Sequence, residues 1–177
     1  MRYNHYLVKG MNALARLLGL SVKVNNEMGE VWEHRLHKSP LFCKLYVCCS
    51  YIDNLLARKK VMALNADYVI CDRWVNDILV DLGAECRFDN LLESQWYNRF
   101  HKILPKGSFQ FVVKRNLEDV LGCRVENHTN PDFKYRFELY KKLMIKSDVS
   151  VVDNTGTIEE SVAQIIRVLT KGETEKE

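Results

Sequence analysis

The most constraining feature of the sequence is a short apolar run, Tyr68 to Cys71, that ends on Asp72 and Arg73. An apolar run rich in β-branched and aromatic residues is typical of a strand that is buried on both faces of a parallel sheet. Ligands of open α/β sheets bind beyond the carboxyl ends of the strands. A carboxylate beside a guanidinium at such a strand end predicts a site for metal and phosphate. The alternative, with equal weight, is an ion pair between the two side chains that caps the strand-to-helix turn.

Length and composition define the broad class of protein. The chain has 177 residues, of which 47% are hydrophobic and 28% charged, and its net charge is only +3. These values are typical of one soluble domain, predicted over residues 1–170, with a charged tail at 171–177. The small net charge argues against nucleic acid as a partner. No apolar run is long enough to span a bilayer, so no membrane partner is expected.

The cysteines indicate the compartment. The chain has six, and none of them forms a CxxC pair or a zinc-finger spacing. They are most simply free thiols in a reducing cytosol. Since no signal-peptide pattern is present either, we expect a cytoplasmic protein.

Hydrophobic spacing and capping residues predict the other elements. We expect helices over residues 11–20, 41–60, 75–82, 88–104, 116–124, 133–145 and 157–169, and strands near 21–25, 68–71, 108–114 and 149–153. Ser39 and Pro40 mark the start of one helix, and Thr157 and Glu160 form a capping box at another. Strands that are separated by helices favour an α/β chain with a parallel sheet and right-handed crossovers.

Several segments, in order, resemble the thymidylate kinases, a family of nucleoside-monophosphate kinases with the P-loop fold. YVICDRW at 68–74 is similar to the family's DRY segment, and MNALARLLGL at 11–20 is similar to the helix after its phosphate loop. SFQFVVK at 108–114 and VVDNTGTIEESVAQII at 151–166 resemble two later strands with the helices that follow them. The resemblance implies an α/β fold of the P-loop NTPase-like kind, a three-layer sandwich with a mostly parallel sheet flanked by helices. Its first strand and phosphate loop would be incomplete.

The resemblance assigns roles on the acceptor side of such a site. Asp72 would be catalytic and would assist a Mg²⁺ ion, and Arg73 would be catalytic and would hold the phosphate of the acceptor. Glu27 stands in a segment that contacts the acceptor phosphate in the family, although a simple turn at Gly29 is an equal alternative. Tyr51 occupies the place of a base-binding arginine, where it could stack on a base or hydrogen-bond to it.

The resemblance also assigns cofactor-binding roles. Lys9 and Gly10 would be the remnant of a GxxxxGK[ST] loop, in which backbone amides wrap the phosphates. Arg124 stands where the family's lid begins, and Asp153 precedes the backbone that approaches adenine. Because the loop at Lys9 and Gly10 is not a competent phosphate loop, the ATP site is predicted to be truncated or degenerate.

The function implied by the resemblance is that of an ATP-dependent kinase related to thymidylate kinase. It would transfer phosphate to a (deoxy)nucleoside monophosphate, with an ATP site that is impaired or truncated in this chain. ATP and Mg²⁺ are the implied cofactors, a small-molecule nucleotide is the implied partner, and a homodimer is possible. The alternative is a non-catalytic nucleotide-binding or scaffold domain with the same fold.

Overall fold

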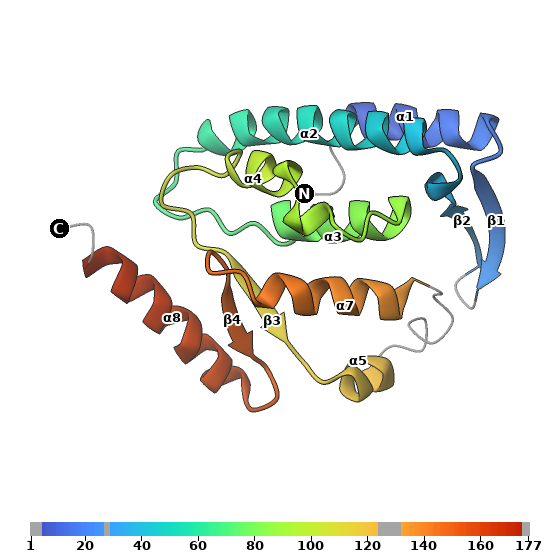
Figure 1. Cartoon of the computed structure of the whole chain (residues 1–177). Coiled ribbons are helices and arrows are strands. Elements are labelled where there is room, and N and C mark those ends of the chain that lie inside the picture. The colour runs from blue at the N-terminus through green and yellow to red at the C-terminus, as the bar shows by residue number, and fades with distance from the viewer. Residues whose placement is uncertain (1–4, 27–28, 124–131, 175–177) are drawn as a thin grey trace. The chain divides into compact units, whose positions relative to one another are not determined.

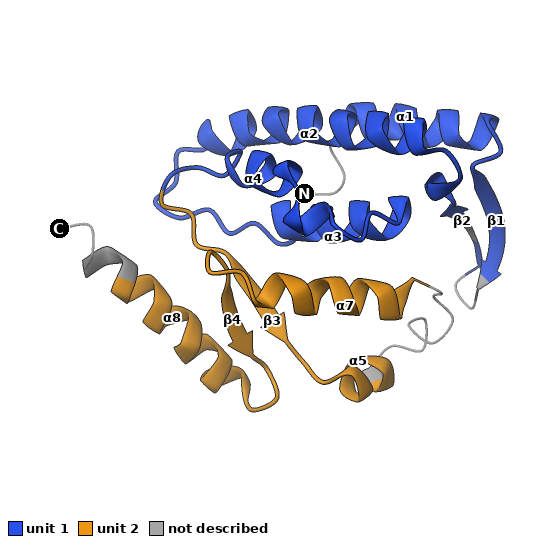
Figure 2. Ribbon diagram, in the orientation of Figure 1, with its two compact units in different colours: residues 1–106 blue, residues 107–177 orange. Residues whose placement is uncertain are grey.

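A computed structural model describes residues 5–26, 29–123 and 132–174. The chain divides into two compact units, residues 1–106 and residues 107–177, which we call unit 1 and unit 2 (Figure 2). Each unit is described by itself. The prediction of a single domain over residues 1–170 stays a prediction.

Unit 1 is built mainly from helices. Its helices are α1 (Tyr6–Leu17), α2 (Pro40–Met62), α3 (Val75–Cys86) and α4 (Gln95–His101), with short 3-10 turns at Leu36–Lys38 and Leu91–Glu93 (Figure 1). α2 begins where the sequence predicts, because Pro40 is its first residue and Ser39 Oγ accepts a hydrogen bond from Phe42 N at 3.4 Å.

Helix α1 begins five residues earlier than the sequence predicts and is anchored by a residue of α2. His5, its N-cap residue, makes no side-chain capping bond. The carboxylate of Asp53 on α2 takes over this role and accepts hydrogen bonds from Leu7 N at 3.1 Å and Val8 N at 2.9 Å. Because the first amides of a helix have no partner within it, this long-range cap holds α1 against α2. At the other end, Gly19 has the positive φ of 69° that is typical after a helix.

The strand predicted near residues 21–25 is present, but it belongs to an antiparallel hairpin. β1 (Ser21–Asn26) pairs with β2 (Gly29–His34), and Ser21 lies opposite His34. Gly29 has a φ of +106°, which side-chain-bearing residues rarely adopt, so a glycine is required at this position. The turn that the sequence predicts before Gly29 would include residues 27 and 28, which lie outside the described residues.

The prediction of a buried strand over Tyr68 to Cys71 is wrong. The segment has no strand structure, and Tyr68 is 77% and Ile70 95% exposed. A strand needs a neighbouring strand that satisfies its backbone amides and carbonyls. Within the described part of unit 1 the strands β1 and β2 pair only with each other, so no strand pairs with residues 68–71. Asp72 and Arg73 therefore do not stand at the end of a sheet strand.

The single helix predicted over residues 88–104 is interrupted at Ser94. Ser94 Oγ donates to Leu91 O at 2.7 Å and accepts from Trp96 N at 3.1 Å, so it closes the 3-10 turn and caps α4. The core face of this stretch is formed by Leu91, Leu92, Phe100 and Ile103, which are at most 3% exposed, whereas Trp96 is only half-buried.

Unit 2 contains a small parallel sheet with helices. β3 (Phe111–Lys114) pairs with β4 (Ser150–Asp153), and Lys114 lies opposite Asp153 (Figure 1). The helices are α5 (Leu117–Cys123), α7 (Phe133–Met144) and α8 (Ile158–Thr174). Val112, Val152, Leu139 and Leu143 are buried and form the core.

The elements of unit 2 lie near their predicted positions, except that α8 continues to Thr174 and so enters the predicted tail at 171–177, and the mixed α/β class is confirmed. The P-loop NTPase-like three-layer sandwich stays a prediction. No helix among the described residues is both long and apolar enough to cross a membrane.

Candidate functional site

The most developed candidate site is the loop that follows β4 in unit 2. The carboxylate of Asp153, the last residue of β4, accepts hydrogen bonds from Thr155 N at 3.0 Å and Thr155 Oγ1 at 2.6 Å. Lys114 Nζ, on the neighbouring strand, lies 3.7 Å from Asp153 Oδ2. These hydrogen bonds, and after them the charge of Lys114, hold the pKa of the Asp153 carboxyl below its usual range. Asp153 is therefore ionised at neutral pH.

Helix α8 fixes the backbone of this loop. Gln164 Oε1 accepts from Asp153 N at 2.9 Å, and Gln164 Nε2 donates to Asp153 O at 3.0 Å. Ser161 is buried, and its hydroxyl lies 3.0 Å from Asn154 Oδ1 and 3.2 Å from Asp153 O. A carboxamide that bonds both the amide and the carbonyl of one residue leaves the loop little freedom, so the Asp153 carboxylate is held in place.

The start of α8 confirms the predicted capping box. Thr157 N donates to Glu160 Oε2 at 2.9 Å, and Glu160 N donates to Thr157 Oγ1 at 3.2 Å. Gly156 lies directly beside the Glu160 carboxylate, and a side-chain carbon at this position would collide with it. The small size of Gly156 is therefore required if Glu160 is to reach the Thr157 amide.

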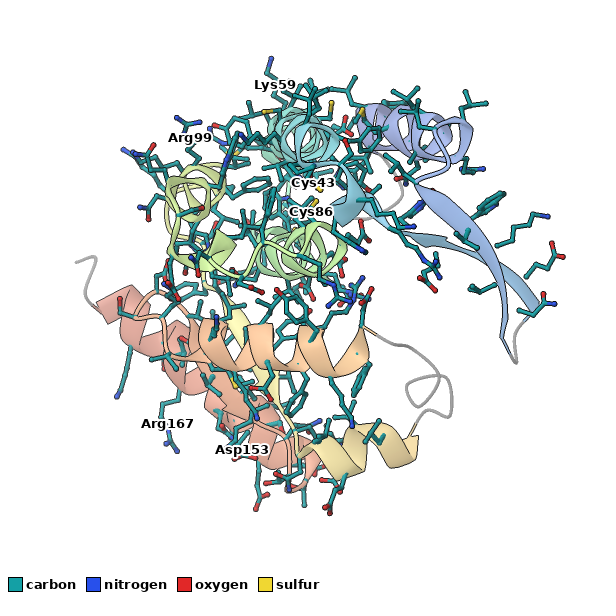
Figure 3. The ribbon with its side chains drawn as sticks, turned by 45° about the vertical axis from the view of Figure 1, so that its right-hand side comes forward. Cys43, Lys59, Cys86, Arg99, Asp153 and Arg167 are labelled. Carbon is teal, nitrogen blue, oxygen red and sulfur yellow. The ribbon has the colours of Figure 1, made fainter. Side chains whose placement is uncertain are left out.

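An open depression of about 410 Å³ lies beside this loop and α8. The following residues line it: Asp153, Thr155, Gly156, Glu160, Ala163, Gln164 and Arg167. Figure 3 labels Asp153 and Arg167, an acid from the sheet and a base from α8. Chemically, the lining offers a fixed carboxylate that can accept hydrogen bonds from hydroxyl groups, and a planar guanidinium that can stack on a ring or bind an anion.

The Asp72 and Arg73 pair lies in unit 1, in the turn that leads into α3. Arg73 has a positive φ of 58°, and its Nε is 3.5 Å from Asp77 Oδ1. Both Asp72 and Arg73 are exposed. Arg73 thus pairs with an acid one helical turn further along the chain. At a non-glycine residue, a left-handed backbone conformation costs of order 1–3 kcal/mol of folding free energy, and residues with such strain cluster at functional sites.

The remaining predicted site residues have different surroundings. Tyr51 packs edge-on against Trp96 and Phe100, with ring centroids 5.9 and 5.4 Å away. Lys9 and Gly10 lie on the exposed side of α1, where their backbone is helical and does not form a phosphate-binding loop. Glu27 and Arg124 lie outside the described residues.

No metal centre is found in the described ranges, where no three His, Cys, Asp or Glu side chains are placed to hold an ion. Mg²⁺ is commonly bound by one or two carboxylates and the phosphates of a substrate. The role of Asp72 as a Mg²⁺ ligand thus stays a prediction, in which one carboxylate and the phosphates of a bound nucleotide would hold the ion.

Sequence reasoning missed the residues that support Asp153. Gln164 and Arg167 lie on α8 one and two turns beyond the capping box, and the helical period could have placed them on the side of the loop. Lys114 could have been found from the parallel pairing of the last residues of β3 and β4. The double hydrogen bond of Gln164 has no local sequence signal.

Comparison of the chain with models of protein families, with curated proteins and with solved structures gives no match. The geometry described above is therefore the basis for a functional proposal.

Proposed function

We propose that the chain is a nucleotide-binding domain related to the thymidylate kinases, and that unit 2 contacts the nucleotide through the depression beside Asp153. The observation that carries the proposal is the position of this depression, at the carboxyl end of the parallel strand β4. Ligands of parallel α/β sheets bind at this end of the strands. The resemblance of residues 151–166 to the adenine-contacting segment of the family supports the same position.

The lining of the depression suits the parts of a nucleoside. Asp153 is ionised and held by Thr155, so it can accept a hydrogen bond from a ribose hydroxyl without rearrangement. Arg167 can stack on a base or bind a phosphate. The volume of about 410 Å³ lies within the usual range for small-molecule sites.

A second candidate function is the ATP-dependent kinase itself, and the backbone of Arg73 favours it. Its left-handed backbone and its ion pair with Asp77 hold the guanidinium at the start of α3, and Asp72 directly precedes it in the chain. In this proposal Arg73 holds the phosphate of a nucleoside monophosphate, and Asp72 holds the Mg²⁺ that would neutralise charge on the transferred group. The phosphates of ATP would be held by groups other than the amides of Lys9 and Gly10, which lie within α1.

Isothermal titration calorimetry on residues 1–177 tests both proposals. The ligands are AMP, ADP, Mg-ATP and dTMP, each compared with inorganic phosphate. We expect an adenine nucleotide to bind the wild type, and Arg167→Ala and Asp153→Asn each to weaken binding about tenfold, the loss expected when one charge-assisted hydrogen bond is removed. Lys141→Ala is the matched control, because Lys141 is an exposed base of unit 2 outside the depression.

The outcomes separate the candidates. Binding that none of the unit 2 substitutions weakens would contradict the assignment to the depression. Binding of dTMP that is lost in Arg73→Ala, together with conversion of dTMP to dTDP in the presence of Mg-ATP, would favour the kinase. If no nucleotide binds any better than inorganic phosphate, both functions are refuted.

A further inference from the structure

The turn that leads into α3 contains a strained residue, Arg73, whose own side chain does not account for the strain. Its φ is 58°, and its Nε lies 3.5 Å from Asp77 Oδ1. In this pair the Arg73 side chain is 48% exposed, and exposed ion pairs contribute little to stability. A strained backbone persists only where the surrounding structure holds it, so contacts of a neighbouring residue are needed.

Trp74, the residue that follows Arg73, is fixed at both its side chain and its backbone. It is 8% exposed, and its indole Nε1 donates to Asn54 Oδ1 of α2 at 3.0 Å. Its carbonyl oxygen accepts from Ile78 N at 3.0 Å, at the start of α3. The side chain of Trp74 is thus held by one helix and its carbonyl by the next. The change of chain direction into α3 therefore falls on Arg73.

Asn54 is oriented for this contact by its own helix. It is fully buried, and its Nδ2 donates to Ser50 O at 2.7 Å, one turn earlier on α2. Because the amide nitrogen is bound to the backbone of α2, the amide oxygen is directed toward the indole of Trp74. A buried amide costs free energy unless its polar atoms are bonded, whereas a leucine would fill similar space without that cost. What the amide adds is a fixed place for the indole on α2.

We propose that Asn54 and Trp74 are positioning residues for Arg73. The hydrogen bond between them holds the backbone of Arg73 in its left-handed conformation and so presents the guanidinium at the start of α3. This inference rests on the second function proposed above, in which Arg73 holds the phosphate of a nucleoside monophosphate. Both residues are buried, so they act on the phosphate only through the place that they give to Arg73.

A comparison of glycine with alanine at position 73 tests the effect on the backbone. Arg73→Gly and Arg73→Ala both remove the guanidinium and its ion pair, so the difference between their melting temperatures reports the backbone alone. Glycine adopts a positive φ freely and alanine does not, so Arg73→Gly should melt above Arg73→Ala. Trp32 and Trp96 lie in unit 1 and are present in every variant, so their fluorescence follows the unfolding.

The double variant Asn54→Leu/Trp74→Phe removes the hydrogen bond without leaving either partner unpaired. Replacing both partners of a buried hydrogen bond by apolar side chains can be nearly neutral, so this variant should melt close to the wild type. In this background the order at position 73 should reverse, with alanine above glycine, because a relaxed backbone favours the residue that restricts the unfolded chain more. If the double variant does not fold, Trp74→Phe alone serves as the background.

Isothermal titration of the full chain with dTMP tests the effect on binding. The double variant should bind dTMP about tenfold more weakly than the wild type, although the two melt at similar temperatures. Tyr46→Phe is the matched control, because it removes another side-chain hydrogen bond of α2, from Tyr46 Oη to Asn12 Oδ1 at 3.0 Å. It should keep the wild-type affinity. A hydrogen bond with a purely structural role would change the melting temperature and leave the affinity unchanged.

The outcomes distinguish the positioning role from the function on which it rests. The proposal is overturned if Arg73→Gly melts above Arg73→Ala by the same margin with and without the hydrogen bond, since other contacts would then hold the backbone. It is also overturned if the wild type and the double variant bind dTMP equally well. If the wild type does not bind dTMP, the kinase function is refuted, and the order of glycine and alanine alone decides whether Asn54 and Trp74 position Arg73.

Discussion

Substitution of Asp53 is the sharpest test of how unit 1 is held together. Asp53 is 2% exposed, and its carboxylate bonds the amides of Leu7 and Val8 at the start of α1. Asp53→Ala removes both hydrogen bonds and leaves α1 without a side-chain cap, because His5 supplies none. The change also leaves a small cavity where the carboxylate was.

The expected cost follows from these contacts. A hydrogen bond to a charged group contributes about 1.5–3 kcal/mol, and relief of the carboxylate's desolvation offsets part of the loss of two such bonds. We therefore expect Asp53→Ala to lower the free energy of unfolding of unit 1 by about 2–4 kcal/mol. Asp53→Asn keeps one carbonyl acceptor and should cost about half as much.

Urea unfolding followed by tryptophan fluorescence measures this loss. All three tryptophans lie in unit 1, so the signal is not mixed with the unfolding of unit 2. Asp67→Ala is the matched control, because Asp67 is exposed in the loop after α2, and its loss should change the free energy of unfolding by less than about 0.5 kcal/mol. A cost below about 0.5 kcal/mol for Asp53→Ala would refute the anchoring role.

Three further predictions concern His34, the buried cysteines and Gly156. Burial, and after it the charge of Arg16, holds the pKa of His34 below its ordinary value of 6.5. The unfolded chain therefore binds more protons near that pH than the folded chain does, and unit 1 should lose stability as the pH falls from roughly pH 7 to pH 5. In urea unfolding, His34→Asn should make the free energy of unfolding depend less on pH over this range. Burial raises the thiol pKa of Cys43 and Cys86, and of Cys49 as well. Cys43 and Cys86 are also shielded from solvent, so iodoacetamide followed by mass spectrometry should label them more slowly than the half-buried thiols Cys48 and Cys49, and equal rates would contradict the packing. Gly156→Ala should displace the Glu160 carboxylate and lower the stability of unit 2 by about 1 kcal/mol in circular dichroism, whereas an unchanged midpoint would show that the capping box is not broken.

The sequence predicts best where a local signal also determines the structure. Ser39 before Pro40 begins α2, and Thr157 with Glu160 begins α8, because a capping side chain bonds amides only two or three residues away. The strands β3 and β4 could be predicted for a similar reason, since both are short, β-branched and bounded by polar residues.

The buried strand at Tyr68 to Cys71 could not be predicted correctly, because an apolar run shows that a segment can be buried but not which segment will pair with it. The nearest strands in sequence, β1 and β2, pair with each other, and this pairing is a property of the whole hairpin. The same limit explains why the anchor of α1 was missed, since Asp53 lies 46 residues from Leu7.

The candidate site in unit 2 was predicted only in part. The resemblance of residues 151–166 to the last strand and helix of the thymidylate kinases assigns a role to Asp153, which is the last residue of β4 in the structure. The neighbours that hold it come from β3 and α8, and they approach it only after the chain has folded. Strand pairing and the helical period could bring Lys114 and Gln164 near Asp153, but no short motif indicates the hydrogen bonds that Gln164 makes with the backbone of Asp153.

The parallel pairing of β3 with β4 has a consequence for how the protein is made. Phe111 pairs with Ser150, so the sheet of unit 2 cannot close until the ribosome has released most of the chain. The hairpin of β1 and β2 joins neighbouring residues and can form much earlier, since short loops close at a lower entropic cost. During synthesis, unit 1 should therefore acquire its structure while β3 still has an unpaired edge, and a stalled chain that ends before residue 150 would carry that edge as a site for aggregation or chaperone binding.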